Sequence, residues 1–165
     1  MPFAITIGSD SSAIEAILKR LREFGGDQYE LFDQIGAELV ESTRQRFIHG
    51  EDVDGNPWKR SWRANLQGGQ TLRDTGRLMN SYTHNPSSHG VEVGTNVPYA
   101  IPLHFGAEIL PKNGAYITFA VAGNYRKVKK ATLPPRTQLG INAEDERMVL
   151  DVVEDFINDY ILRST

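Results

Sequence analysis

The amino-acid sequence predicts an α+β domain, in which a small antiparallel β-sheet packs against a long helix, with a further helix at each end of the chain. Apolar residues recur at helical spacing over residues 27–48 and again over 142–162. Between them, residues 116–121 are rich in the β-branched and aromatic side chains that favour strands. Helices and strands occur in separate groups, which is typical of α+β domains. The 165 residues can bury a core of their own, so we expect a single domain over 1–165 with its core at about 27–162.

The expected elements begin near the N-terminus. Residues 3–7 alternate apolar with small or polar side chains, which predicts a short strand. A helix over about 12–24 follows, because Ser12 and Glu15 fit a capping box. The helix over 27–48 is the longest amphipathic segment, and we expect it to pack across the sheet.

Residues 49–70 are expected to form a mobile loop, because glycines and Pro57 interrupt them. Trp58 and Trp62 lie in this loop, although tryptophan is usually well buried. One interpretation is that a tryptophan tethers the loop to the core, which we favour for Trp58. The other is that Trp62 and Arg63 form an interface anchor, because these residue types carry much of the binding energy of protein interfaces.

Residues 71–106 contain several short elements. Asp74 is placed to cap a short helix, on which Leu78 and Tyr82 would share a face. The elements expected after it are a turn at 85–90, a strand at 91–93, a break at 94–96 and a compact aromatic turn at 97–106.

The last third is expected to hold a mobile loop, a hairpin and a long helix. Residues 107–115 carry proline and Asn-Gly signals of a mobile loop. The strand-like residues 116–121 can pair with 125–130 through a Gly-Asn turn at 123–124. Asn142 caps the final helix, whose first turn is acidic and therefore favours the positive end of the helix dipole.

The composition argues against several classes of protein. The net charge is −3, whereas proteins whose main task is to bind nucleic acid non-specifically are usually basic. The absence of cysteine excludes disulfides and thiolate metal sites. No apolar run approaches the ~20 residues that span a bilayer, and the chain does not start with a signal-peptide pattern. We therefore expect residence in a cytoplasm.

We expect no catalytic, metal or cofactor site, and hence no enzyme. The histidines lack a zinc-site spacing. Residues 52–56 begin like a calcium loop, but Gly55 comes too early and Arg63 stands where a bidentate glutamate is needed. Nucleophile-elbow and phosphate-cradling glycine motifs are missing.

The charge pattern leaves three interpretations open. The segment 123–136 contains basic residues and no acid, namely Arg126, Lys127, Lys129, Lys130 and Arg136, whereas the final helix is acidic. In the first interpretation this is an ordinary edge hairpin, whose lysines discourage unwanted strand pairing. In the second, the basic hairpin and the acidic helix of different copies pair head to tail, and such contacts close into rings when the rotation allows. In the third, the hairpin faces DNA that passes through a ring, and the contact is salt-dependent.

Four short motifs follow one another at a recognisable spacing. They are Gly55-Asn56-Pro57-Trp58, Asp74-Thr75-Gly76-Arg77-Leu78, the run 93–100 (VGTNVPYA) followed by Phe105-Gly106, and the run 134–140 (PPRTQLG). Together they resemble the virion morphogenesis (tail-completion) proteins of tailed bacteriophages, especially Mu-like phages, over roughly 28–162. The resemblance gives structural roles to Gly55, Pro57, Trp58, Asp74, Thr75, Gly76, Leu78, Gly94, Tyr99, Ala100, Phe105, Gly106, Pro134, Arg136, Leu139 and Gly140. The chain departs from the family pattern at Leu103-His104 and at Thr137-Gln138.

The resemblance implies a non-catalytic virion subunit that completes the tail or joins it to the head at the neck. Its expected partners are copies of itself in a ring such as a hexamer, tail tube or tail terminator proteins, head–neck proteins and packaged DNA, but no membrane. It would act in the cytoplasm of the bacterial host and stay in the tail or neck if incorporated. The alternative is a small nucleic-acid-associated protein that uses the basic hairpin. The candidate interface residues are Trp62, Arg63, Arg126, Lys127, Lys129 and Lys130.

Overall fold

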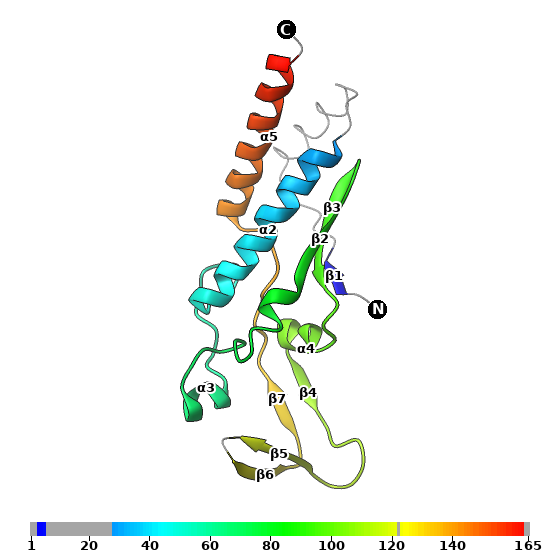
Figure 1. Ribbon diagram of the computed structural model, residues 1–165. Coiled ribbons are helices and arrows are strands. Elements are labelled where there is room, and N and C mark those ends of the chain that lie inside the picture. The colour runs from blue at the N-terminus through cyan, green and yellow to red at the C-terminus, as the bar shows by residue number, and fades with distance from the viewer. Residues whose placement is uncertain (1–2, 6–27, 122, 164–165) are drawn as a thin grey trace.

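The computed structural model describes residues 3–5, 28–121 and 123–163, and its elements form an elongated molecule (Figure 1). In chain order they are β1 (Phe3–Ile5), α2 (Tyr29–His49), α3 (Trp62–Gln67), the 3-10 helix η1 (Met79–Ser81), β2 (Tyr82–Ser87), β3 (Gly90–Thr95), α4 (Ala100–Phe105), β4 (Ala107–Ile109), β5 (Ile117–Val121), β6 (Asn124–Val128), β7 (Ala131–Leu133) and α5 (Ala143–Arg163). The α+β class is confirmed. The helix expected over 12–24 lies outside the described residues. None of the described helices has the length and apolar character needed to cross a membrane.

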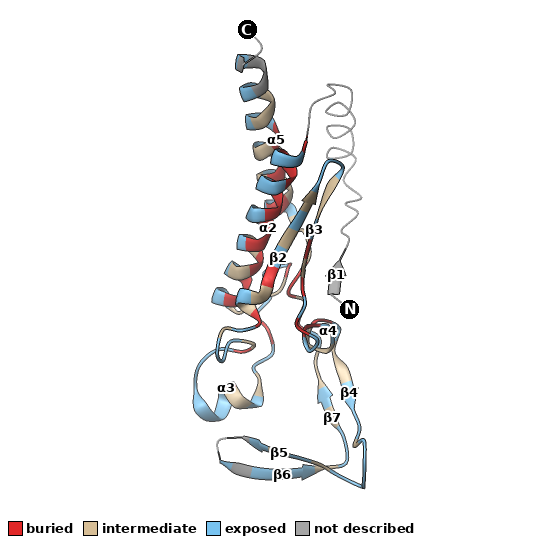
Figure 2. Ribbon diagram, turned by 45° about the vertical axis from the view of Figure 1, so that its right-hand side comes forward, coloured by how far each residue is buried: buried red, intermediate tan, exposed pale blue. Residues whose placement is uncertain are grey.

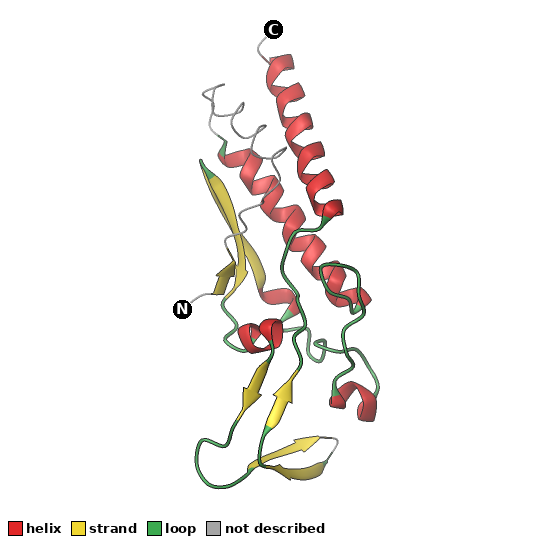
Figure 3. Ribbon diagram, turned by 180° about the vertical axis from the view of Figure 1, so that it is seen from behind, coloured by secondary structure: helices red, strands yellow, loops and turns green. Residues whose placement is uncertain are grey.

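Helix α2 is the middle layer of the larger end of the molecule, between α5 and the antiparallel sheet β1-β3-β2 (Figures 1 and 3). Its buried apolar residues are Leu31, Phe32, Ile35, Leu39, Val40 and Phe47, whereas Tyr29, expected on the same stripe, is exposed. Gly36 allows the helix to approach the sheet closely, because a Cβ there would lie 2.6 Å from the His84 ring and 2.7 Å from Val91. The prediction of a long helix packed across the sheet is confirmed.

An aromatic cluster forms the centre of the core, and Figure 2 shows the buried residues gathered in α2, α5 and the β2–β3 hairpin. The Phe47 ring centre lies 5.3 Å from that of Trp58 and 5.8 Å from that of Tyr82. Trp58 also donates from Nε1 to the Thr137 carbonyl at 3.3 Å. Trp58 therefore ties the loop after α2 to the core, as the tethering interpretation proposes.

A buried ion pair joins α2 to the start of α5. Arg46 pairs with Asp145, and its Nη1 donates to the Gly140 carbonyl at 2.9 Å. Asn142 Oδ1 accepts from the Asp145 N–H at 2.9 Å, and the Asp145 carboxylate accepts from the Asn142 N–H at 3.0 Å. This reciprocal pattern is a capping box, so the predicted Asn142 cap is confirmed.

The turn expected at 85–90 is mostly strand, which corrects the prediction. β2 continues to Ser87, and β3 returns from Gly90 to Thr95, so Gly94 lies within a strand and does not end it. Pro86 is tolerated because β2 is an edge strand, where the missing N–H removes no ladder hydrogen bond. Turn-forming composition was therefore outweighed by pairing with the apolar strand β3.

The prediction of a helix that begins at Asp74 is also wrong, because helical structure here is confined to the 3-10 helix η1. Residues 71–78 form turns, and Gly76 has a φ of 79°, which a right-handed helix cannot continue through. The Asp74 carboxylate lies 3.5 Å from the Arg63 guanidinium instead of capping backbone N–H groups. Tyr82, expected on that helix, begins β2 and is buried in the core.

Both segments expected to be irregular loops contain regular structure. Within 49–70, α3 begins after Ser61, whose Oγ accepts from the Ala64 N–H at 3.1 Å as an N-cap. Within 107–115, β4 pairs with β7, a strand that the sequence analysis did not predict. The compact turn at 97–106 contains the short helix α4. Whether these segments move remains a prediction.

The smaller end of the molecule is an arm, residues 107–133, built from two separate two-stranded sheets (Figure 1). β4 pairs with β7, and β5 pairs with β6, which confirms the predicted hairpin. Asn124 pairs with Val121, so β6 begins one residue earlier than expected and ends at Val128. None of the arm residues whose exposure the structure describes is buried, as Figure 2 shows.

Candidate assembly interface at the base of the molecule

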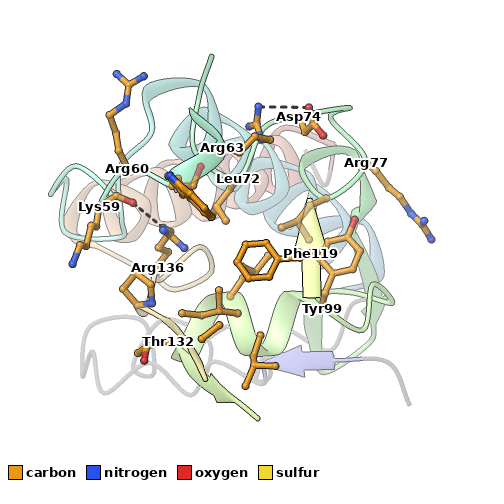
Figure 4. A pocket seen from close by; sticks show the side chains of 18 of the residues that line it. Lys59, Arg60, Arg63, Leu72, Asp74, Arg77, Tyr99, Phe119, Thr132 and Arg136 are labelled. Atoms are coloured by element: carbon orange, nitrogen blue, oxygen red, sulfur yellow. Dashed lines mark hydrogen bonds and ion pairs between the residues drawn. The ribbon is translucent and has the colours of Figure 1, made fainter. Parts of the chain in front are cut away.

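A groove of about 760 Å³ opens where α3, the loop 71–78, α4 and the arm meet (Figure 4). Its walls are mainly aromatic and aliphatic: Trp62, Leu72, Leu78, Tyr99, Leu103, Ile109, Ile117, Phe119 and Leu133. Trp62 is 40% exposed and Tyr99 is 42% exposed. We call this hollow the base groove. Its exposed apolar walls are typical of surfaces that bind another protein.

Trp62 connects α3 to the β5–β6 hairpin. Its ring centre lies 5.8 Å from that of Phe119, edge to face, and 5.3 Å from the Arg126 guanidinium carbon. Phe119 and Arg126 are cross-strand partners, so both reach Trp62 from one face of the hairpin. The structure thus brings together two candidate interface residues that are far apart in the sequence, and the contact has cation–π character.

Arg63 holds the loop that forms one wall of the groove. Its Nη2 donates to the carbonyls of Gln70 at 2.6 Å and Arg73 at 2.9 Å. Between them, Leu72 has a φ of 62°, a left-handed conformation that is strained for a branched residue. Arg63 therefore positions the groove wall, and the backbone strain at Leu72 is held by the hydrogen bonds around it.

Positive charge dominates among the described residues that line the groove. The cations are Lys59, Arg60, Arg63, Arg77 and Arg136, and the one acid is Asp74. Figure 4 shows Lys59, Arg60 and Arg77 extending outward, whereas Arg136 lies at the wall. Asp74 already pairs with Arg63, so its charge is compensated. A surface of this kind favours an acidic partner.

Arg136 is the buried cation of the groove, with 5% of the residue exposed. Its Nε donates to the Lys59 carbonyl at 3.0 Å, and its backbone N–H donates to the Leu103 carbonyl at 3.0 Å. Burial lowers the pKa of its guanidinium from the ordinary value. No acid in the described part of the chain forms an ion pair with it. A buried guanidinium without a carboxylate is costly and is suited to accept one.

Several of the predicted motif residues meet at the groove. Those that line it are Asp74, Thr75, Gly76, Leu78, Tyr99, Pro134 and Arg136. Those elsewhere are Gly55, Pro57, Trp58, Gly94, Ala100, Phe105, Gly106, Leu139 and Gly140. Gly106 lies where the arm leaves the body, with a φ of 78°, and a Cβ there would lie 2.9 Å from the Leu133 carbonyl oxygen. Its hydrogen side chain is therefore required for the chain to pass β7.

The remaining basic residues of the hairpin do not form one patch with the groove. Lys130 pairs with Glu108 across the β4–β7 end of the arm. Lys127 pairs with Thr118 in the ladder, on the opposite face from Arg126. Lys127 and Lys129 are exposed. Among these described basic residues, only Arg126 contacts Trp62 at the groove.

Sequence reasoning missed other residues of the groove. Phe119 and Ile117 were recognised as strand residues, but their alternation with polar Thr118 was the signal that one face of β5 needs cover. Leu72 and Lys59 carry no local signal, because their place in the groove depends on contacts across the chain.

A second hollow, of about 820 Å³, lies between the end of α2 and the start of α5. Its acidic lining residues are Glu38, Glu41, Glu51, Asp52, Asp54, Glu144 and Asp145. Arg46 neutralises Asp145, and the Asp52 carboxylate accepts from the backbone N–H groups of Asp54 and Asn56. Asp145 and Asp52 thus already have partners within the chain, so this hollow is the weaker candidate for a binding surface.

Comparison with known proteins agrees with the resemblance seen in the motifs. The family described as the phage virion morphogenesis family matches residues 9–158. The Mu-like prophage FluMu G protein 2 of Haemophilus influenzae is 28% identical over 149 residues, which cover 90% of this chain and 91% of that protein. No solved structure matches the chain.

Proposed function

Since the chain belongs to the phage virion morphogenesis family, we propose that it is a structural, non-catalytic subunit that acts where the tail meets the head. In this role it completes the tail or joins it to the head at the neck. Its partners are further copies in a ring, tail tube or tail terminator proteins, and head–neck proteins. It assembles in the cytoplasm of the bacterial host and, if incorporated, lies at the tail or neck of the virion. The likeness to a Mu-like prophage protein supports a phage or prophage origin.

The observation that carries an assembly role is the arm. It has no buried residue among those whose exposure is described, yet it presents Ile109, Leu110, Tyr116 and Tyr125 with exposures of 40%, 65%, 52% and 80%. Isolated two-stranded hairpins are marginally stable and need packing against something else. An arm of this kind is best supported by neighbouring subunits, which would bury its apolar residues on assembly.

The alternative, DNA binding by the hairpin 123–136, receives less support. Arg126 lies over Trp62 and Lys130 pairs with Glu108, so two of its basic residues already have partners within the chain. Arg136 is buried, so Lys127 and Lys129 remain for phosphate contacts. Heparin retention that falls steeply with salt would favour this alternative.

Replacing the outer arm tests the assembly role. Ile109 and Ala131 are directly paired, so residues 110–130 can be exchanged for a two-residue Asn-Gly turn that closes the β4–β7 hairpin. The body should fold as before, because its core lies outside the arm. In a phage whose own copy of this gene is deleted, the wild-type chain should restore infectious particles, whereas the shortened chain should leave unjoined heads and tails under the electron microscope.

A matched control keeps the arm and changes a surface residue away from it, for example Glu92→Gln, which should restore particles fully. Normal titre from the deleted phage without any complementing chain would overturn the proposed function. Full complementation by the shortened chain would overturn the role of the arm.

A further inference from the structure

The base groove lacks an acid for its buried cation. Arg136 forms no ion pair with a described residue, and the one acid that lines the groove, Asp74, pairs with Arg63. Figure 4 shows Asp74 and Arg136 on opposite sides of the hollow. Apolar side chains, including Trp62 and Phe119, line the same groove as Arg136. The groove therefore suits a segment that carries a carboxylate next to an apolar side chain.

Helix α5 presents such a segment at the other end of the molecule. Asp151, Asp155 and Asp159 follow one another at four-residue spacing, so they share a face of the helix. Glu154 and Leu162 adjoin this face, all five residues are exposed, and Leu162 is 75% exposed. Figure 1 shows α5 projecting beyond the body at the end opposite the arm. We call these five residues the α5 stripe.

We propose that the base groove of one copy receives the α5 stripe of a second copy, with Arg136 pairing with a carboxylate of the stripe. The proposal rests on the proposed function, and it names the contact through which subunits associate. The two surfaces are complementary in charge, since the stripe carries four carboxylates and the groove is lined by basic residues. They lie at opposite ends of one chain, so the contact is head to tail and can close into a ring.

A protein segment fits the groove better than a nucleic acid does. A phosphate backbone is recognised by exposed cations, and bases stack on exposed aromatic faces. Here the cation Arg136 is buried in a groove whose walls are mainly apolar, and the Trp62 ring already contacts Phe119 and Arg126. A carboxylate is also the anion whose geometry matches a guanidinium in a bidentate pair.

Complementary charge reversal tests the contact with the full chain. One variant reverses the stripe, Asp155→Lys with Asp159→Lys. The other reverses two exposed residues at the groove, Lys59→Glu with Arg77→Glu. Each alone should weaken self-association at least tenfold in sedimentation equilibrium at low salt. An equimolar mixture should regain association, because each variant then offers the surface that the other needs.

A control variant, Glu38→Lys with Glu92→Lys, makes the same charge change as the stripe variant at exposed acids outside both surfaces, and it should associate like the wild type. Arg136→Gln should weaken association as strongly as the double reversals. Loss of the thermal unfolding transition in Arg136→Gln would show that this variant does not fold. The mixture of the stripe and groove variants then still tests the contact, because the four residues substituted in those variants are exposed.

Three results would overturn the proposal: a wild-type chain that stays monomeric at every attainable concentration, variants that associate normally, or a mixture that stays dissociated. Loss of binding to a duplex oligonucleotide in the groove variant, with self-association unchanged, would instead assign the groove to phosphate. All of these outcomes are measured on purified protein and concern the subunit contact alone. The proposed function is tested separately, and it would be overturned if a phage that lacks the gene assembled normally.

Discussion

At the scale of single residues, His104 and Gln138 form a buried contact. The Gln138 N–H donates to His104 Nδ1 at 3.2 Å, and the Tyr82 hydroxyl donates to Gln138 Oε1 at 2.7 Å. Burial raises the pKa of Tyr82 above its ordinary value and lowers that of His104. His104 and Gln138 therefore form a hydrogen-bonded connection between α4 and the chain leading to α5.

Protonation of His104 should make the protein less stable in mild acid. Its Nδ1 accepts a hydrogen bond, so the imidazole is neutral in the fold, whereas the unfolded chain binds a proton below about pH 6.5. Stability is fully present above that pH and falls as the pH drops toward the lowered folded pKa, by at most about 1.4 kcal/mol per pH unit. Urea unfolding at pH 7.5, 6.5 and 5.5 measures this slope.

The variant His104→Gln should be less stable at pH 7.5 but should lose this part of the slope. His89→Gln, at an exposed turn, should keep the wild-type slope. Equal slopes in the wild type and His104→Gln would show that His104 is not the responsible group.

At the scale of elements, the Arg46–Asp145 pair fixes α5 on α2 at the point where the chain enters the last helix. Both side chains are buried, and Asp145 also accepts from the Asn142 N–H of the cap. The carbonyl of Gly140 accepts from Arg46, so the linker is held as well as the helix. One carboxylate thus serves an ion pair and a helix start, and its removal affects both elements.

Asp145→Asn should lower the free energy of unfolding by about 3–5 kcal/mol, because it leaves the Arg46 charge buried without a partner. The neighbouring Glu144→Gln is the control: Glu144 is exposed, so its loss should cost about 0.3–1 kcal/mol through the helix dipole. Adding Arg46→Met to Asp145→Asn should recover part of the loss. If chemical denaturation gives the same cost for Asp145→Asn and Glu144→Gln, the ion pair does not join the helices as described.

At the scale of the whole molecule, the chain divides into a body with a core and an arm without one. The core residues come from α2, α5, the β2–β3 hairpin and the loops that touch them. The arm attaches through Gly106 and through the Trp62 contact with Phe119. A structure of this kind concentrates its stability in the body, because the buried apolar side chains lie there and not in the arm.

Hydrogen exchange should therefore differ between the two ends. In the free subunit, amides of β5–β6 should exchange several orders of magnitude faster than those of α2 and β3, because opening the arm exposes little apolar surface. In assembled particles the arm amides should gain protection, whereas those of α2 should change little. Mass-spectrometric exchange on both samples measures this. Arm amides protected equally in the free subunit would show that the arm is stable without neighbours.

Elements with local signals could be predicted from the amino-acid sequence. The periodicity of α2 and α5, the Asn142 cap and the β5–β6 hairpin each depend on residues a few positions apart, and all were predicted. The family also followed from the sequence, since its short motifs keep their order along the chain.

The base groove, in contrast, is formed by contacts between distant parts of the chain. Arg136 donates to the carbonyl of Lys59, and Trp62 meets Phe119, although these partners are more than fifty positions apart in the sequence. Such contacts leave no periodic pattern, because they depend on how α4 and Gly106 direct the arm beneath the body. For the same reason β7 could not be predicted. It is too short to carry a sequence signal of its own, and it is a strand because it pairs with β4.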